Sequence, residues 1–369
     1  MAVASFPLIE LPQEIIVDVF AVLELGGSKD DLRNLAYTCK RLYSIGQQFL
    51  VSDITVTWQL LDAFRAKLDT SLAPVRSYIT SFTINIPSSW GEWHRFETLQ
   101  DVFELCTNIN SLTLTLSGSS KWMQYMRPNT HIRSLKLVSS QASGLPALFD
   151  TADLHAFKSV EELHLEYFRL QCEYPIEERA TPLLTTVRNL EIVNCEWNYP
   201  FSMSLFKRLD SLAVYYSIKC EAFTFSERLK NLAANPPPTI KRFIMHLNLF
   251  SPVRQKTWYP VLKDCKKLES ISMKGFRYPD YEFFALLPPS LKEVELHMTS
   301  KNLVALTHSN SLDTGMGGML AMNSQIVPVD ARAEENDGIQ GRVLNKYGDT
   351  NVRVVAHEWA ESMEQRIAR

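Results

Sequence analysis

One six-residue pattern, apolar-x-x-apolar-x-apolar, returns along most of the sequence and constrains its fold more than any other feature. Its ten copies are Val51/Ile54/Val56, Ile79/Phe82/Ile84, Ile109/Leu112/Leu114, Ile132/Leu135/Leu137, Val160/Leu163/Leu165, Val187/Leu190/Ile192, Leu209/Leu212/Val214, Ile240/Phe243/Met245, Leu268/Ile271/Met273 and Leu291/Val294/Leu296. The middle positions of successive copies are separated by about 27 residues on average, a period typical of repeat proteins. The pattern therefore predicts one structural unit repeated many times.

Each copy has the spacing of a short strand with one apolar face, because side chains alternate across a strand. The stretches between copies, such as 98–108, are compatible with helices. A single strand and helix cannot bury both apolar faces, whereas stacked copies share a continuous core and align their strands in parallel. We therefore predict an α/β fold over residues 51–300, with about ten irregular repeats and a parallel sheet on the concave face.

The segment before the repeats, residues 6–50, predicts three short helices. Pro12 suits the first turn of a helix, and Leu11, Ile15 and Val19 follow at four-residue spacing. Asp30 favours the start of a second helix, and a third follows through Leu50. So small a unit hides only ~60% of its chain surface, so another partner must cover part of it.

The sequence LPQEIIVDVFAVLEL, followed by DLRNLAYTCKRLYSIGQQFLVSDITV, resembles the F-box, especially its fungal form. The resemblance covers roughly residues 6–56, and the degenerate repeats that follow resemble the leucine-rich repeats of F-box proteins. The resemblance implies an N-terminal three-helix F-box, followed by a leucine-rich-repeat solenoid. F-boxes bind the Skp-family adaptor of cullin-based ubiquitin ligases. The plainer alternative is a helical cap on the next domain.

The resemblance implies a non-catalytic substrate receptor of a Skp–cullin–F-box ubiquitin ligase, which holds an unknown protein substrate on its repeats. The alternative is a leucine-rich-repeat interaction scaffold with no role in ubiquitin transfer. The positions that we expect to contact the adaptor are those left without an apolar partner in the small unit, namely Leu11, Pro12, Ile15, Val19, Leu32, Cys39 and Leu42.

The residues between the apolar positions of each strand should face the concave surface. On the later strands these are Glu162, His164, Glu166, Glu191, Tyr215, His246, Glu293, Glu295 and His297, which we predict as substrate-binding residues. Their carboxylates favour a basic segment, although a merely solvated mixed-charge face is the alternative. A shared metal ion is not expected, because His164 and His246 lie three strands apart, or ~14 Å.

No catalytic or cofactor motif is evident. The glycine-rich stretch 315–320 lacks the last glycine of a dinucleotide loop, and His357-Glu358 lacks the second histidine of a zinc-protease helix. The 38 basic and 41 acidic residues give a net charge of -3 without a block of like charge, so neither nucleic acid nor a membrane is an expected partner. The six cysteines are far apart, which favours reduced thiols and an intracellular protein, cytoplasmic or nuclear.

The pattern fades after residue 300. Residues 301–350 mix glycine, polar and acidic residues, and we expect a loop or disordered segment there. Within 351–369, the residues Val355, Trp359, Met363 and Ile367 recur every four positions, which predicts a C-terminal helix. Such a helix would cap the last repeat or dock onto a partner.

Overall fold

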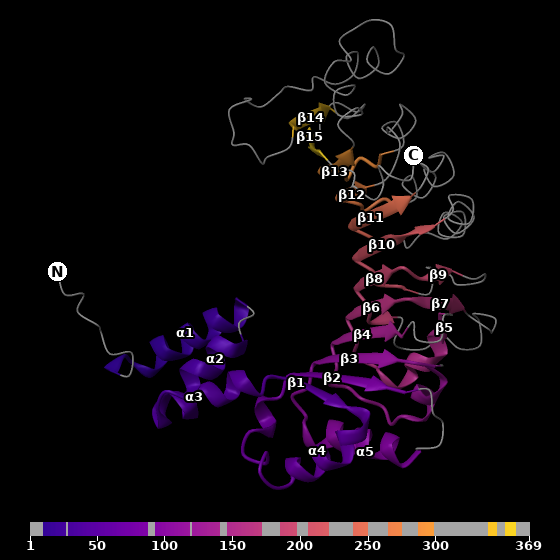
Figure 1. Ribbon diagram of the computed structural model, residues 1–369. Coiled ribbons are helices and arrows are strands. Elements are labelled where there is room, and N and C mark those ends of the chain that lie inside the picture. The colour runs from indigo at the N-terminus through magenta and orange to yellow at the C-terminus, as the bar shows by residue number, and fades with distance from the viewer. Residues whose placement is uncertain are drawn as a thin grey trace, which may run out of the picture.

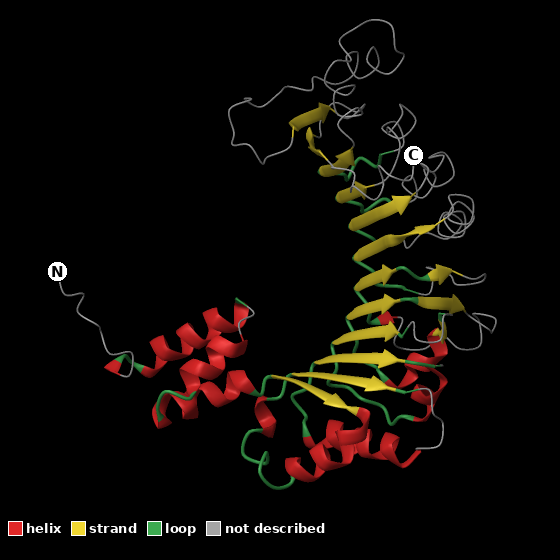
Figure 2. Ribbon diagram, in the orientation of Figure 1, coloured by secondary structure: helices red, strands yellow, loops and turns green. Residues whose placement is uncertain are grey.

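The computed structural model shows a tall sheet whose first strand adjoins an N-terminal group of helices (Figures 1 and 2). It describes residues 10–26, 29–87, 93–118, 120–140, 146–171, 185–197, 206–220, 239–249, 265–274, 287–298, 339–344 and 351–358. The fold is mixed α/β, as predicted, and most of the sheet is parallel.

The N-terminal unit has the three expected helices, α1 (Gln13–Leu25), α2 (Lys29–Ala36) and α3 (Lys40–Leu50). They enclose a small core of their own, made of Ile16, Phe20, Leu32, Ala36 and Leu42. The ring of Phe20 stacks on that of Phe49, with 5.5 Å between centroids. This core is separate from that of the sheet.

Every copy of the six-residue pattern supplies a strand of one parallel sheet, and these ten strands stand in chain order. They are β1 (Asp53–Thr57), β2 (Ser81–Ile86), β3 (Ser111–Leu116), β4 (Ser134–Ser139), β6 (Glu162–Glu166), β8 (Asn189–Val193), β10 (Ser211–Cys220), β11 (Arg242–Leu249), β12 (Ser270–Lys274) and β13 (Glu293–Met298). The middle apolar residues pair in one register from Ile54 to Val294. The predicted ten-strand parallel sheet is therefore confirmed.

Helices cover one face of the first strands. They are η2 (Trp58–Leu60), α4 (Leu61–Leu68), η3 (Arg76–Tyr78), α5 (Trp93–Leu105), η4 (Ser120–Tyr125) and η6 (Thr151–Ala156). The ring of Phe82 on β2 contacts Phe64 of α4 and Phe103 of α5, at 5.8 and 6.2 Å between centroids. This face of the sheet is therefore the core side, and the opposite face is open to other contacts.

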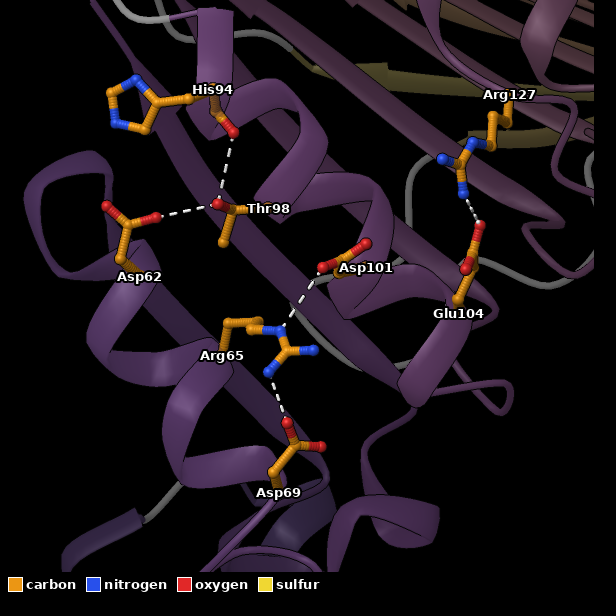
Figure 3. Close-up of polar contacts among 8 residues, drawn as sticks. All are labelled: Asp62, Arg65, Asp69, His94, Thr98, Asp101, Glu104 and Arg127. Carbon is orange, nitrogen blue, oxygen red and sulfur yellow. Dashed lines mark hydrogen bonds and ion pairs between the residues drawn. The ribbon is translucent and has the colours of Figure 1, made fainter.

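Polar contacts join α4 to α5 on the outside of this helical layer (Figure 3). The Arg65 guanidinium lies 3.4 Å from Asp101 and also pairs with Asp69. Nearby, the Thr98 hydroxyl donates to Asp62 at 2.8 Å. Further along, Arg127 pairs with Glu104 at 2.6 Å. These exposed pairs orient the two helices, but each contributes little to stability.

A second, three-stranded sheet follows the middle repeats, with β5 (Ala147–Asp150), β7 (Phe168–Gln171) and β9 (Glu196–Trp197) in parallel. The chain bends into β7 and β9 through equivalent residues with positive φ, Tyr167 at 61° and Asn194 at 50°. After the second bend, the Cys195 thiol donates to the Leu165 carbonyl and accepts the Phe168 amide. The buried thiol thus links successive bends.

The C-terminal segment differs from its prediction. Residues 351–358 form a strand, β15 (Asn351–Glu358), which pairs in parallel with β13, so the predicted helix is wrong there. The β-branched Val352 and Val354 alternate with polar residues, a period of two that the four-residue spacing had masked. The expected loop contains β14 (Ile339–Leu344), antiparallel to β15. Residues 301–338, 345–350 and 359–369 lie outside the described part.

The helical unit joins the sheet directly, since α3 ends at Leu50 and β1 begins at Asp53. Two polar contacts bridge the junction. The Ser52 hydroxyl donates to Glu24 of α1 at 2.6 Å, and Lys29 of α2 pairs with Asp53 at 2.7 Å. The short connection and these contacts keep the helices next to the first strand.

We predict that Gly46→Val destabilises the helical unit by about 1–3 kcal/mol, because a larger side chain overpacks its core. A Cβ at Gly46 would lie 2.8 Å from the Phe20 ring, which is buried and stacked. The matched control is Gly26→Val, where the nearest atoms to a Cβ lie 3.5 Å away. Urea unfolding followed by circular dichroism measures both variants. Equal stability of the two would contradict this packing.

We also predict that Cys106 and Cys195 resist alkylation in the native protein. Burial raises the pKa of Cys106 to about 11 and that of Cys195 to about 12, so both remain protonated thiols at pH 8. Cys39 is only partly buried and should react first. Iodoacetamide labelling at pH 8, read by peptide mass spectrometry with and without urea, checks this. Native labelling of Cys195 at the rate of Cys39 would refute it.

Candidate interaction surfaces

Helix α1 exposes three large apolar side chains on the side away from its core face. Its core face buries Ile16 and Phe20 completely. Ile15, Val22 and Leu25 are 44%, 67% and 88% exposed. Val22 lies seven residues after Ile15 and three before Leu25, which places all three on one side of the helix, different from the core face. The exposed Asp18 lies among them, three residues after Ile15 and four before Val22, so this side is apolar around one carboxylate. The second face therefore has the character of a contact surface.

The structure divides the seven predicted adaptor contacts. Ile15 and Pro12 are exposed, Val19 is half-buried, and Leu11 and Cys39 pack partly against the small core. Leu32 and Leu42, at 3% and 2% exposure, lie inside that core, so the prediction that they face a partner is wrong. Their apolar spacing reflected packing between the three helices themselves. Cys39 caps α3, where its sulfur accepts the Leu42 amide.

Sequence reasoning missed two tyrosines of this unit. Tyr37 and Tyr43 are 65% and 41% exposed, and their rings stack with centroids 5.8 Å apart. The missed signal was their amphipathic character, since tyrosine is enriched where an apolar body must also meet water. We call Ile15, Val22, Leu25, Tyr37 and Tyr43 the exposed apolar set.

The open face of the sheet carries the residues predicted to contact a substrate. Its middle row, in register across β4 to β13, reads Lys136, His164, Glu191, Ala213, Ile244, Ser272 and Glu295. A neighbouring row contains Glu166, Tyr215, His246 and Lys274. The alternation predicted from sequence thus brings these side chains to one surface.

Four of these residues form a charged cluster on β4, β6 and β8. His164 lies between two carboxylates, with its Nδ1 2.9 Å from Glu191 and its Nε2 3.3 Å from Glu166. Lys136 also lies 3.3 Å from Glu166. The hydrogen bond from His164 lowers the pKa of Glu191 against a smaller opposing effect of burial. Glu166 already pairs with both His164 and Lys136 inside the protein.

An aromatic pair follows on the next strands. The rings of Tyr215 and His246 meet edge to face, with centroids 5.4 Å apart. Beside them, Ala213 and Ile244 are each only 8% exposed although they belong to the outer row, so neighbouring side chains shelter them. His246 Nε2 lies 2.9 Å from the Ser272 hydroxyl. We call Ala213, Tyr215, Ile244 and His246 the aromatic platform.

The other predicted substrate contacts lie on β6 and β13. Glu162 is exposed on β6, whereas Glu293 and Glu295 are half-buried on β13. The backbone of His297 pairs with Lys274, but its side chain lies outside the described residues. Among the side chains that the structure describes, no group of three or more His, Cys, Asp or Glu residues could hold a metal ion. Within the same part of the chain, every helix is too short or too polar to cross a membrane.

No model of a known protein family matches the sequence, and no curated protein is similar to it. A function is therefore inferred from these two surfaces and from the resemblance of the sequence itself.

We predict that His164→Ala raises the pKa of Glu191 toward its ordinary value of 4.5. The lowered pKa means that this carboxylate stabilises the fold above its ordinary pKa and loses that effect as pH falls through the lowered value. Carbon-detected NMR titration of labelled glutamates measures the change. Glu269, whose pKa is lowered by Lys292, is the internal control and should not move. An unchanged Glu191 titration would show that His164 is not the cause.

Proposed function

We propose that this chain is the substrate-recognition subunit of a Skp–cullin–F-box E3 ubiquitin ligase, acting inside the cell. The helical unit (residues 10–50) would be the F-box that binds the Skp-family adaptor, and the strand array would be a leucine-rich-repeat solenoid that holds a protein substrate. The observation that carries the proposal is the exposed apolar face of α1, within a segment whose sequence resembles the F-box.

Exposed side chains of this kind favour a stable protein partner. Ile15, Val22 and Leu25 are large aliphatic residues on one helix side, and desolvating them on binding stabilises a complex. Tyrosine is also frequent among the residues that dominate interface energies. The exposed charged residues beside the aliphatic residues of α1 are acidic, namely Glu14, Asp18 and Glu24, whereas nucleic acid favours a basic surface.

The sheet supports the second half of the proposal. Ten parallel strands in one register make a long, rigid surface whose outer positions vary without disturbing the core. Extended surfaces of this kind suit protein ligands better than small molecules, which prefer enclosed sites. Binding of a substrate here, and of an adaptor at the helices, would hold the substrate near the ligase's other subunits.

Such a subunit needs no nucleophile of its own. Holding two reactants together raises their effective concentration, so ubiquitin transfer would be accelerated by proximity. The low reactivity expected of Cys106 and Cys195 fits a thiol set that supports packing instead of chemistry. We accordingly propose that the chain is not an enzyme by itself and uses no cofactor.

We predict that the double change Ile15→Asp and Val22→Asp weakens binding to a purified Skp-family adaptor by at least ~100-fold, since it places charge in a desolvated interface. Both residues are exposed, so the helical core stays intact. Leu60→Asp is the control, because Leu60 is 59% exposed but lies outside the helical unit. Calorimetric titration measures each affinity. Undiminished binding by the double variant would remove the adaptor assignment.

Co-purification distinguishes the ligase subunit from the alternative scaffold. The affinity-tagged chain, expressed with the adaptor and a cullin, should recover both proteins in equal amounts. Recovery of the adaptor without the cullin would favour a scaffold that borrows the adaptor for another assembly.

A further inference from the structure

The open face has one place where a carboxylate, an aromatic ring and sheltered apolar side chains meet. Glu191 on β8 is in register with Ala213 on β10, which is in register with Ile244 on β11. Ala213 has the shortest side chain of this row, and Tyr215 lies two residues further along the same strand. A ligand side chain laid across β10 would therefore contact both the carboxylate and the ring.

The polar groups here have capacity left for a ligand. Glu191 is 44% exposed, and among the described residues only His164 bonds to it, through Oε2. The other carboxylate oxygen can therefore accept a further hydrogen bond. The Tyr215 hydroxyl has no hydrogen-bond partner within the described part of the chain, in contrast to Tyr216, whose hydroxyl donates to the Cys195 carbonyl. The Tyr216 hydroxyl therefore bonds within the protein, whereas the Tyr215 hydroxyl on the opposite face can bond to a ligand.

The charges that surround Tyr215 favour a cation. Burial raises the pKa of Tyr215, and the Glu191 carboxylate raises it further, against the Arg242 guanidinium; Glu295 adds to the increase. These two carboxylates and one guanidinium act on the phenol, and Lys274 is in register with His246 on the neighbouring strand. The phenol stays protonated at neutral pH, so its ring and its O–H are both available to a ligand.

We propose that the aromatic platform and Glu191 together bind an arginine side chain from an extended segment of the partner protein. The guanidinium would lie over the Tyr215 ring and pair with the open oxygen of Glu191, as arginine does at aromatic and carboxylate groups. The Tyr215 hydroxyl would donate to a backbone carbonyl of the same segment. This inference rests on the proposed function, since it names the chemistry of the substrate that the repeats would hold.

The test uses the purified full chain alone, so its result does not depend on adaptor binding. A phage-displayed library of random 12-residue peptides is selected on the protein, and the affinity of the enriched peptides is measured by fluorescence anisotropy. We expect a shared arginine, whose replacement by the uncharged citrulline weakens binding at least ~10-fold. In Glu191→Gln, the difference between the arginine and citrulline peptides should shrink several-fold, which is the signature of coupling between the two groups, and the contact with the Tyr215 ring accounts for the part that remains.

Two further variants complete the design. Tyr215→Leu keeps an apolar side chain but removes the ring and hydroxyl, and should weaken the arginine peptide by a similar factor. Glu104→Gln, on the helical side of the sheet beside Arg127, removes a carboxylate that is 58% exposed, against 44% for Glu191, and should bind like the wild type (Figure 3). Enriched peptides without arginine, or a citrulline effect that is undiminished in Glu191→Gln, would overturn the proposal. A selection that enriches no peptide would overturn it as well.

Discussion

The whole molecule depends on one register. From Ile54 on β1 to Val294 on β13, equivalent apolar residues stand side by side on parallel strands and form a single buried layer. A shift of one residue in any strand would turn its apolar set outward, so each strand fixes the next. The steadiness of this layer allows the intervening segments to vary, as helices in the first repeats and as short strands β5, β7 and β9 in the middle ones.

The same register separates the residues that pack in the core from the residues that can contact a ligand. Outward positions change from one strand to the next, from threonine at Thr113 to Lys136, His164 and Glu191, and then to Ala213 and Ile244. None of these changes disturbs the buried layer behind them. In the charged cluster, Glu166 already pairs with His164 and Lys136. Glu191 and the aromatic platform still have polar groups that can bind a ligand. The recognition site that we propose is thus on β8, β10 and β11.

The strand array could be predicted from the sequence because its signal is long-range and repeated ten times. The helical unit was predictable in outline, but amphipathic spacing cannot tell a face that packs within the unit from one that meets a partner, so Leu32 and Leu42 were assigned to the wrong side. The three-stranded sheet escaped notice because its strands are two to four residues long. At the C-terminus, Val355 belonged to a helical spacing and to a strand at once, and pairing with β13 decided between them.

The junction between Leu50 and Asp53 is short, so the number of strands sets the distance from the helical unit to a site on the sheet. Ser52 bonds to Glu24 and Asp53 pairs with Lys29, so two polar contacts accompany the short connection between the helices and the first strand. Each further strand adds ~4.8 Å, so Tyr215, on the seventh strand of the sheet, lies six spacings or ~29 Å from β1. A ligand held there is presented at a set height above the helical unit. Gain or loss of one repeat between the helical unit and Tyr215 would change this distance by one strand spacing and would leave both surfaces unaltered.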